Sequence, residues 1–280
     1  YMREGIYPNE PPFVPGLEGA GVVRAVGPGV TTVAPGDRVA WSNTMGSYAT
    51  LVAVPAAELV LVPEGTDLDL AAAVLLQGMT AHYLVHDTHP VAPGDAVLVH
   101  AGAGGMGLLL CQMARAAGAH VLATTSSPEK DALARDAGAH ETLRYGSSPG
   151  ELPARVRELT GGEGVAVVYD GVGAATFDDS LASLRVRGVL ALYGAASGPV
   201  APVDPQRLNS GGSLYLTRPS LHWHVRTPEQ LAARGSAVFS SVAAGDLTVR
   251  VGGRYPLDAA PEAHRDLQSR RTTGKLLLLP

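Results

Sequence analysis

The stretch from Val97 to Gly107, VLVHAGAGGMG, constrains the fold of this chain more than any other part of its sequence. An apolar segment leads into three spaced glycines, Gly102, Gly104 and Gly107, and the apolar segment LLLCQMARAAGA follows them. This GxGxxG pattern, placed between an expected strand and an expected helix, is typical of dinucleotide-binding folds. We interpret Gly102 as permitting the tight turn, Gly104 as letting the backbone approach a pyrophosphate, and Gly107 as letting the helix pack closely on the strand. The amide groups at the start of that helix would then face the phosphates.

The segments after the glycine turn repeat the order of strand and helix. ARAAGAH at residues 114–120 is echoed by ARDAGAH at residues 134–140, and in each the glycine suits a helix end before a strand. A helix near residues 154–159, the strand VAVVYD, the helix TFDDSLASLR and the strand VLALYG come next. Five strands alternating with helices predict an α/β fold, a doubly wound parallel Rossmann sheet that binds its ligand at the carboxyl ends of its strands.

The remainder of the chain predicts a second, β-rich domain. Residues 1–62 contain short apolar runs, among them SYATLVAV at residues 47–54, separated by Gly-Pro and Pro-Gly turns, which indicates a small barrel or half-barrel. Residues 68–86 predict a helix that joins the domains, and the C-terminal residues are expected to return to the first domain. We therefore predict a β-rich domain of residues 1–77 and 223–280 and an inserted dinucleotide-binding domain of residues 78–222.

Composition and charge argue against two classes of partner, nucleic acids and membranes. The 280 residues carry a net charge of −5 and the basic residues are scattered, so we expect no nucleic-acid partner. No apolar run approaches the length that spans a bilayer, and the polar start YMREGIYPNEPP is no signal peptide, so we expect no membrane partner. The single cysteine, Cys111, lies in the apolar helix after the glycine turn, which indicates a small buried residue and not a reactive thiol. These observations favour a cytoplasmic protein.

The residues at the end of the second predicted strand favour NADPH over NADH. A carboxylate that binds the ribose hydroxyls of NADH is expected about twenty residues beyond the glycine motif. That place holds Thr124, Thr125, Ser126 and Ser127, with Lys130 just after them. Hydroxyl groups and an ammonium group suit a 2′-phosphate, and no carboxylate is expected there to repel it. The alternative that Lys130 only lies on the surface of the next helix stays open.

The histidines and the cysteine do not form a zinc motif. One cysteine excludes a four-thiolate site. His82 and His86 stand one helical turn apart, and His222 and His224 are expected to share one face of a strand. No carboxylate ligand stands at a supporting spacing, so we interpret these histidines as surface or interface residues and expect no metal. No GxSxG motif indicates a hydrolytic nucleophile either.

Segments spread from one end of the chain to the other carry a family resemblance. They are YMREGIYP, PGLEGAGVV, PGDRVAW, LLQGMTAHYL, VLVHAGAGGMGLLLCQ, SSPEK, VYDGVG, GSLYLTRP and AHRDLQSRRTTGKLLLLP. Together they resemble the zinc-independent quinone oxidoreductases, the ζ-crystallin-like branch of the medium-chain dehydrogenase/reductase superfamily. The resemblance implies that the β-rich domain is GroES-like. It also implies the loss of a zinc ligand, because Leu17 stands where zinc-dependent relatives carry a histidine.

The same resemblance assigns site residues. It implies a pyrophosphate site at Gly104, Gly105, Met106 and Gly107, a 2′-phosphate site at Ser126 and Lys130, and an adenosine contact at Tyr145. It implies that the rest of the cofactor lies along Thr80, Tyr193, Gly194 and Arg270. The catalytic residues that it implies, facing the nicotinamide and the substrate, are Tyr1 and Tyr7.

The chain departs from the family pattern in two places. Family members usually carry alanine where Gly102 stands, a difference that we expect to be harmless. The family's first domain begins well before Tyr1 and includes an asparagine near the nicotinamide. We therefore expect the β-rich domain to be N-terminally incomplete, with unpaired strand edges. On this expectation cofactor binding survives while catalysis suffers.

Our leading hypothesis is an NADPH-dependent reductase that delivers a hydride, without zinc, to a small-molecule quinone or other α,β-unsaturated carbonyl held between the domains. The alternatives are an enoyl-thioester reductase and a non-catalytic NADPH-binding protein. The β-prone run SLYLTRPSL is either a core strand or a sheet edge. The family resemblance favours an edge that pairs with a second copy, in a homodimer.

Overall fold

The chain divides into two compact units. The computed structural model describes residues 9–145, 148, 150–269 and 271–280. The first unit comprises Tyr1–Met79, Val225–Gly245 and Val249–Pro280, and the second comprises Thr80–His224 and Asp246–Thr248. Contacts within the chain define these two units, and such contacts do not show whether each unit folds independently. The predicted boundaries, with 78–222 inserted between 1–77 and 223–280, therefore stay a prediction.

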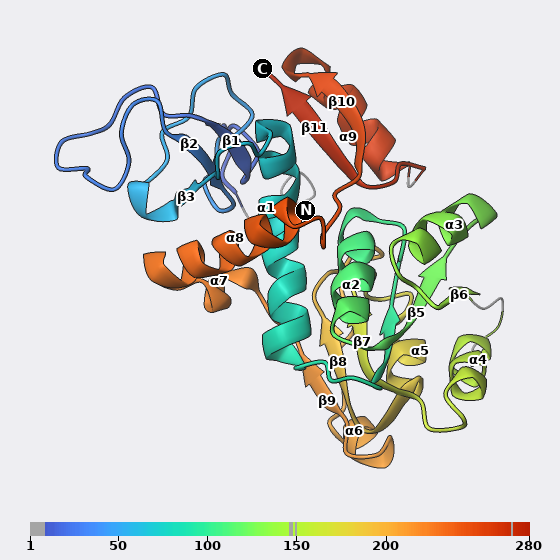
Figure 1. Ribbon diagram of the computed structural model, residues 1–280. Coiled ribbons are helices and arrows are strands. Elements are labelled where there is room, and N and C mark those ends of the chain that lie inside the picture. The colour runs from blue at the N-terminus through green and yellow to red at the C-terminus, as the bar shows by residue number, and fades with distance from the viewer. Residues whose placement is uncertain (1–8, 146–147, 149, 270) are drawn as a thin grey trace. The chain divides into compact units, whose positions relative to one another are not determined.

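A parallel sheet of six strands forms the centre of the second unit, in the order β6-β5-β4-β7-β8-β9 (Figure 1). The strands are β4 (Ala96–Val99), β5 (His120–Thr125), β6 (Glu141–Arg144), β7 (Val165–Asp170), β8 (Leu184–Leu192) and β9 (Tyr215–Thr217). The chain enters the sheet at β4, runs outward to β6, and returns to place β7 on the other side of β4. The strand order reverses between β4 and β7, where open parallel sheets bind their ligands. The predicted doubly wound α/β fold is confirmed, with β9 as a further strand.

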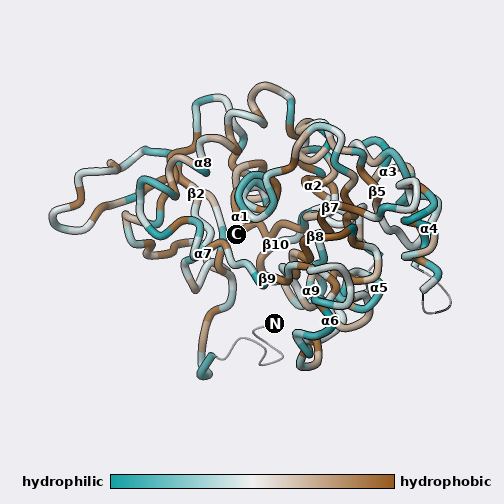
Figure 2. The backbone as a smooth tube through the Cα atoms, turned by 90° about the horizontal axis from the view of Figure 1, so that it is seen from below, coloured by the Kyte–Doolittle hydropathy of each residue, from teal (hydrophilic) through white to brown (hydrophobic). Residues whose placement is uncertain are grey.

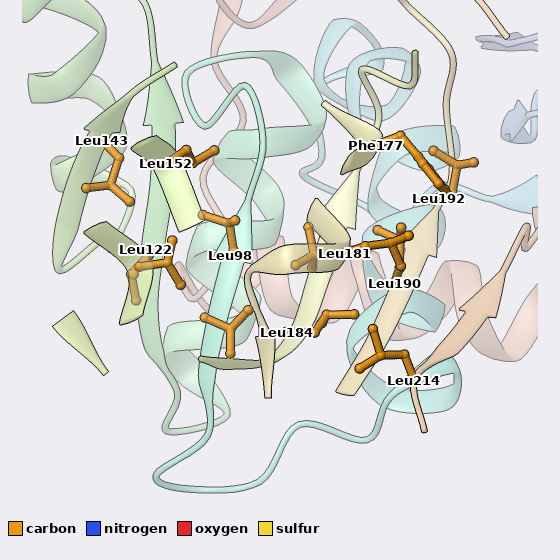
Figure 3. Close-up of a cluster of buried hydrophobic side chains, with 13 residues drawn as sticks. Leu98, Leu122, Leu143, Leu152, Phe177, Leu181, Leu184, Leu190, Leu192 and Leu214 are labelled. Carbon is orange, nitrogen blue, oxygen red and sulfur yellow. The ribbon is translucent and has the colours of Figure 1, made fainter. Parts of the chain in front are cut away.

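Helices pack on the strands of this sheet in two groups. They are α2 (Gly105–Ala116), α3 (Pro128–Asp136), α4 (Glu151–Leu159), α5 (Phe177–Ala182) and the short α6 (Gln206–Ser210). α2 packs with α3, and α4 packs with α5. Alternate residues of a strand point to opposite faces of a sheet. Leu98, Leu122 and Leu190, from three different strands, accordingly join one buried cluster with side chains of α4 and α5 (Figure 3).

The central strands are apolar along their length. Every residue of β7, VAVVYD, is buried, and Val97, Leu98 and Val99 of β4 have no exposed surface. A parallel sheet covered on both faces requires such continuous apolar runs. Figure 2 shows the hydrophobic colour on β7 and β8 and more hydrophilic colour on α3 and α4. Cys111 on α2 is buried, as predicted, and burial raises the pKa of its thiol to about 12.

The first unit contains a small antiparallel sheet in the order β1-β2-β3 and a parallel pair of strands. Its elements are β1 (Gly19–Val22), β2 (Arg38–Trp41), β3 (Val60–Leu61), β10 (Val251–Pro256), β11 (Lys275–Leu279), α8 (Pro228–Ala243), α9 (Ala260–Gln268) and the 3₁₀ helices η1 (Ala56–Glu58) and η3 (Leu257–Ala259). The prediction of a strand at residues 47–54 is wrong. Ser47 and Tyr48 donate their amides to the carbonyls of Gly16 (3.2 Å) and Pro15 (3.0 Å), but no ladder follows from these bonds.

The helix α1 (Leu68–Tyr83) continues into the π-helical turn η2 (Leu84–Thr88). Together they are long and apolar enough, by length and composition, to cross a membrane, so the expectation that no apolar run reaches that length is wrong. More than half of this segment is buried inside the protein, including Val74, Leu75 and Met79. The core helix of a globular unit has the same composition, and packing therefore explains the apolar run.

Candidate functional site

The glycine turn joins β4 to α2 at the carboxyl edge of the parallel sheet. Its left-handed residue is Ala101, with a φ of 51°, and not a glycine. The Ala101 amide donates to the Tyr145 hydroxyl (3.0 Å), and the Gly102 amide donates to the Thr124 carbonyl (2.8 Å) on β5. A Cβ on Gly102 would lie 2.7 Å from the Cβ of Ala123. The interpretation of Gly102 as the residue that bends the turn is therefore wrong, because its lack of a side chain serves close approach to β5.

The start of α2 presents backbone amides that suit an anion. Gly104 is the N-cap residue, with φ −76° and ψ 168°, and no side chain caps the helix. The first-turn amides of Gly105, Met106 and Gly107 have no acceptor inside the helix. A Cβ on Gly107 would lie 2.2 Å from the Ala101 carbonyl oxygen, so glycine allows the helix to approach the turn closely, while its predicted packing on the strand stays a prediction. Unbonded amides and the positive end of the helix dipole together favour a phosphate.

A buried chain of hydrogen bonds lies beneath the turn. His100 has no exposed surface, and its Nδ1 lies 3.1 Å from Thr124 Oγ1 and its Nε2 2.9 Å from Ser180 Oγ. Ser180 donates its hydroxyl to Asp170 Oδ2 (2.7 Å), so its oxygen accepts the proton on His100 Nε2. Nδ1 then accepts from the Thr124 hydroxyl, whose oxygen accepts the Ala101 amide (3.1 Å). These hydrogen bonds require a neutral imidazole. Burial also lowers the pKa of His100, which agrees with the neutral form.

Asp170 ends β7 and organises the backbone that follows. Its Oδ1 accepts the amides of Val172 (2.8 Å) and Gly173 (3.0 Å), and its Oδ2 accepts the hydroxyls of Thr176 (2.8 Å) and Ser180. These bonds satisfy a carboxylate that has no exposed surface. The loop after β7 is thereby fixed beside the glycine turn through the same buried chain.

Three of the predicted cofactor residues gather around these strand ends. The Tyr145 ring stacks on the His100 ring, with 5.9 Å between their centroids. Tyr193 and Gly194 follow β8, and both donate their amides to the Asp170 carbonyl, at 2.9 and 3.3 Å. Burial raises the pKa of Tyr193, and Asp170 and Tyr145 add to the shift, so the Tyr193 hydroxyl keeps its proton.

Lys130 and Ser126 form a pair at the end of β5. The Lys130 ammonium donates to Ser126 Oγ (3.1 Å), and Ser127 Oγ caps α3 by accepting the Lys130 amide (3.3 Å). The structure thus brings together the two residues predicted for a 2′-phosphate, with a hydroxyl and an ammonium group side by side. Their role toward a phosphate stays a prediction.

Two charged residues beside this pair escaped the sequence prediction. Asp131, in the first turn of α3, accepts the hydroxyl of Thr125. Arg144, the last residue of β6, donates from Nη1 to Asp131 Oδ1 and from Nη2 to Oδ2, each at 2.5 Å. The Arg144 guanidinium holds the pKa of Asp131 below its usual value. A carboxylate therefore does lie near the end of β5, but the following helix contributes it, and no local pattern indicates that contact.

Known proteins match the chain from end to end. The family model described as alcohol dehydrogenase GroES-like domain matches residues 1–64, and the model described as zinc-binding dehydrogenase matches residues 105–220. A quinone oxidoreductase of Pseudomonas aeruginosa is 44% identical over 100% of this chain and 86% of its own length. The chain belongs to the zinc-independent quinone oxidoreductase family of the medium-chain dehydrogenase/reductase superfamily.

Two further proteins are similar to this member of the quinone oxidoreductase family. A 2-haloacrylate reductase of Burkholderia sp is 44% identical over 100% of this chain and 86% of its own length. A mycobacterial protein, solved in complex with NADPH, has a TM-score of 0.98 and 54% identity and covers 100% of this chain and 87% of its own. The GroES-like unit and the Rossmann sheet are therefore the family's architecture.

The position of the lost zinc ligand agrees with membership of a zinc-independent family. Leu17 offers no ligand atom, and the neighbouring Glu18 is paired with Lys275. The rings of His82 and His86 lie 4.4 Å apart. Within the described ranges, no three His, Cys, Asp or Glu residues gather in a group able to hold a metal ion. The expectation that the chain uses no metal stays a prediction.

His222 and His224 do not share a strand face, so that prediction is wrong. They lie in the short helix α7 (Leu221–His224), after β9 has ended. Pro219 stands between the two elements, and proline cannot continue a sheet ladder. His224 instead stacks on the Tyr83 ring, with 4.1 Å between centroids.

Four further site residues are predicted from the family resemblance alone. Tyr1, Tyr7 and Arg270 lie outside the described residues. Thr80 is half-buried on α1, in the same unit as the glycine turn. The roles that the resemblance implies for all four stay predictions.

Proposed function

We propose that this chain is an NADPH-dependent reductase that transfers a hydride, without zinc, to a quinone or another α,β-unsaturated carbonyl. The observation that supports this proposal most is a pair of groups suited to anions after two adjacent strands: the amides that begin α2 after β4, and Ser126 with Lys130 after β5. NADPH has a pyrophosphate and a 2′-phosphate that suit these two sites. The NADPH complex of the mycobacterial relative supports the same cofactor.

The residues present fit this cofactor. A Cβ on Gly104 would meet only the Ala101 carbonyl oxygen, at 3.2 Å, so the backbone there is open to a close pyrophosphate. Gly104, Gly105, Met106 and Gly107 would hold that group, and Tyr145 would border the adenosine. When bound, NADPH supplies the hydride, and the protein supplies orientation and exclusion of water.

The tyrosines are the proposed hydroxyl donors of the reaction. Burial keeps the proton on Tyr193, so its hydroxyl acts beside the cofactor as a hydrogen-bond donor and not as a base. We assign the acceptor side to Tyr1 and Tyr7, whose hydroxyls would stabilise negative charge that develops on the acceptor oxygen. Thr80, Gly194 and Arg270 would complete the cofactor contacts.

NADPH oxidation with 1,4-benzoquinone, 9,10-phenanthrenequinone and crotonyl-CoA tests the proposal. We expect turnover with the quinones and NADPH. We expect Lys130→Glu to raise the KM for NADPH by roughly tenfold or more and to leave the KM for NADH nearly unchanged, because a carboxylate then faces the 2′-phosphate. Arg135→Glu, a charge reversal in the last turn of α3, is the matched control. An equal loss with both cofactors would count against the phosphate role of Lys130.

A second candidate is an enoyl-thioester reductase. The relative named 2-haloacrylate reductase supports a conjugated alkene as acceptor. A kcat/KM for crotonyl-CoA far above the values for both quinones would favour this candidate. NADPH binding without oxidation by any acceptor would instead leave a non-catalytic NADPH-binding protein.

We also propose a homodimer formed through β9, in the cytoplasm and without nucleic-acid or membrane partners. β9 pairs with β8 and is the last strand of the sheet (Figure 1). Tyr215 on β9 is 54% exposed, and Trp223 beyond it is 67% exposed. A strand at a sheet edge with exposed aromatic side chains is suited to pairing with its symmetry mate. A monomeric mass in light scattering at micromolar concentration would contradict the homodimer.

A further inference from the structure

A carboxylate lies beside the residues that we propose hold the 2′-phosphate of the cofactor. Asp131 directly follows Lys130, and it accepts the hydroxyl of Thr125, which directly precedes Ser126. A fixed negative charge at this strand end repels a phosphate and favours the free ribose hydroxyls of NADH. Taken alone, Asp131 therefore opposes the proposed cofactor.

Arg144 offsets the charge of Asp131, and the pairing of β5 with β6 places it there. Thr125 of β5 and Arg144 of β6 are register partners, which places the guanidinium over the strand end. Two parallel bonds at 2.5 Å join the guanidinium to both oxygens of Asp131, and Nη1 also donates to Thr125 Oγ1 (2.5 Å). Such bidentate pairs are among the strongest and most directional in proteins. The pair lowers the pKa of Asp131 and raises that of Arg144, as mutual stabilisation requires.

The local charge balance depends mainly on this arginine. Glu129, Lys130, Asp131 and Arg144 carry the charges at this corner, two negative and two positive, and Arg135 acts more weakly on Asp131 from one helical turn away. Glu129 is exposed and hydrogen-bonds the Ser127 hydroxyl. Without Arg144, Asp131 would lose the guanidinium that binds it, and only the weaker attraction of Arg135 would offset the carboxylate charge beside Lys130.

We propose that Arg144 determines cofactor specificity: by binding Asp131 it removes the charge that would reject a 2′-phosphate, and so lets Ser126 and Lys130 bind one. The inference rests on the proposed NADPH-dependent function. The ligand class is an adenosine nucleotide that carries a 2′-phosphate. Arg144 acts through Asp131, and a substitution that neutralises Asp131 makes Arg144 dispensable.

Calorimetric binding of 2′,5′-ADP and 5′-ADP to the full chain tests this without turnover. We expect the unaltered chain to bind 2′,5′-ADP more tightly than 5′-ADP. Arg144→Met should weaken 2′,5′-ADP binding by roughly tenfold and leave 5′-ADP binding within about twofold, because only the phosphate meets the uncompensated carboxylate. Adding Asp131→Asn to Arg144→Met should return the affinity for 2′,5′-ADP to within about threefold of the unaltered chain.

Arg135→Met is the matched control. The Arg135 side chain is 49% exposed, against 45% for Arg144, and it bonds to the His140 carbonyl and Thr142 Oγ1 at the other end of α3. Arg135 has the weakest effect of the groups that shift the pKa of Asp131, so its loss should change each nucleotide affinity by less than about twofold.

Three results would overturn the role of Arg144. They are an unchanged preference in Arg144→Met, an equal loss of both nucleotides in that variant, and a double variant as weak as Arg144→Met. Equal binding of both nucleotides by the unaltered chain would reject the proposed NADPH function together with the inference. A preference in the unaltered chain that survives Arg144→Met would reject the inference alone.

Discussion

At the scale of single residues, the glycine turn depends on two small residues that approach each other, and not on its glycine alone. Gly102, in the turn after β4, approaches Ala123 of β5, and a Cβ added to Gly102 would lie 2.7 Å from the Cβ of Ala123 and 3.4 Å from that of Ala134. Methyl carbons in contact lie about 3.5–4.0 Å apart, so alanine at position 102 requires a shift of the turn. The expectation that glycine is harmless here in place of the family's alanine stays a prediction, and the contact with Ala123 favours it, because glycine is the residue that fits.

We accordingly expect Gly102→Ala to lower the free energy of unfolding by about 1–3 kcal/mol, the usual cost of overpacking a filled core. NADPH affinity should fall with it, because Gly102 bonds to the Thr124 carbonyl and positions the start of α2. Adding Ala123→Gly removes the opposing methyl group, so the double variant should be more stable than Gly102→Ala. Urea unfolding and NADPH titration of the three proteins measure both effects. Strictly additive losses would contradict the pairing of positions 102 and 123.

At the scale of helices, the same capping sequence occurs once in each unit. α3 begins Ser-Pro-Glu and α8 begins Thr-Pro-Glu, and in both the hydroxyl accepts the amide three residues on, at 3.3 Å. The cap hydroxyl also lowers the pKa of the following glutamate in both helices, Glu129 and Glu229. The two caps are chemically alike, yet only the first holds the backbone of Lys130.

This likeness gives a matched pair of variants. Ser127→Ala and Thr227→Ala should each lower the free energy of unfolding by about 1 kcal/mol, because each leaves a helix amide without its acceptor. Only Ser127→Ala should also weaken 2′,5′-ADP binding, since it loosens the turn that carries Lys130 and Ser126. Denaturant unfolding and calorimetry report the two quantities separately. Equal nucleotide affinity in the two variants would show that the cap of α3 does not position the site.

At the scale of the whole molecule, the sequence predicts the features that interactions between neighbouring residues determine, such as the order of strands and helices. The order β4, turn, α2 follows from glycine spacing and apolar runs, and so does the doubly wound sheet. The contact of Arg144 with Asp131 spans 13 residues and that of His100 with Ser180 spans 80, so each exists only once the strand order is set. The segment at residues 47–54 has the β-prone residues of a strand but makes only isolated bonds, which periodicity does not distinguish from a ladder.

The buried imidazole links the stability of the molecule to pH. Burial lowers the pKa of His100, and partial burial with the nearby His120 lowers that of His140. In the unfolded chain histidine titrates near pH 6.5. Below that pH the unfolded chain binds protons that these histidines do not bind in the fold, so acid favours unfolding. Their neutral forms are fully compatible with folding above about pH 6.5, and stability falls as the pH drops from there toward their lowered pKa values.

We therefore expect the free energy of unfolding to fall by up to about 1.4 kcal/mol per pH unit for each such histidine below about pH 6.5. Asp95 and Asp131, whose pKa values are lowered, lose their charge only below about pH 4 and do not contribute to this window. His100→Gln keeps a donor for Ser180 but cannot titrate, so its slope should be shallower by about one bound proton even if the variant is less stable. Urea unfolding between about pH 5 and about pH 7 measures the slope. An identical slope in the variant would mean that His100 is protonated inside the fold, with its Nδ1 donating to the Thr124 hydroxyl and not accepting from it.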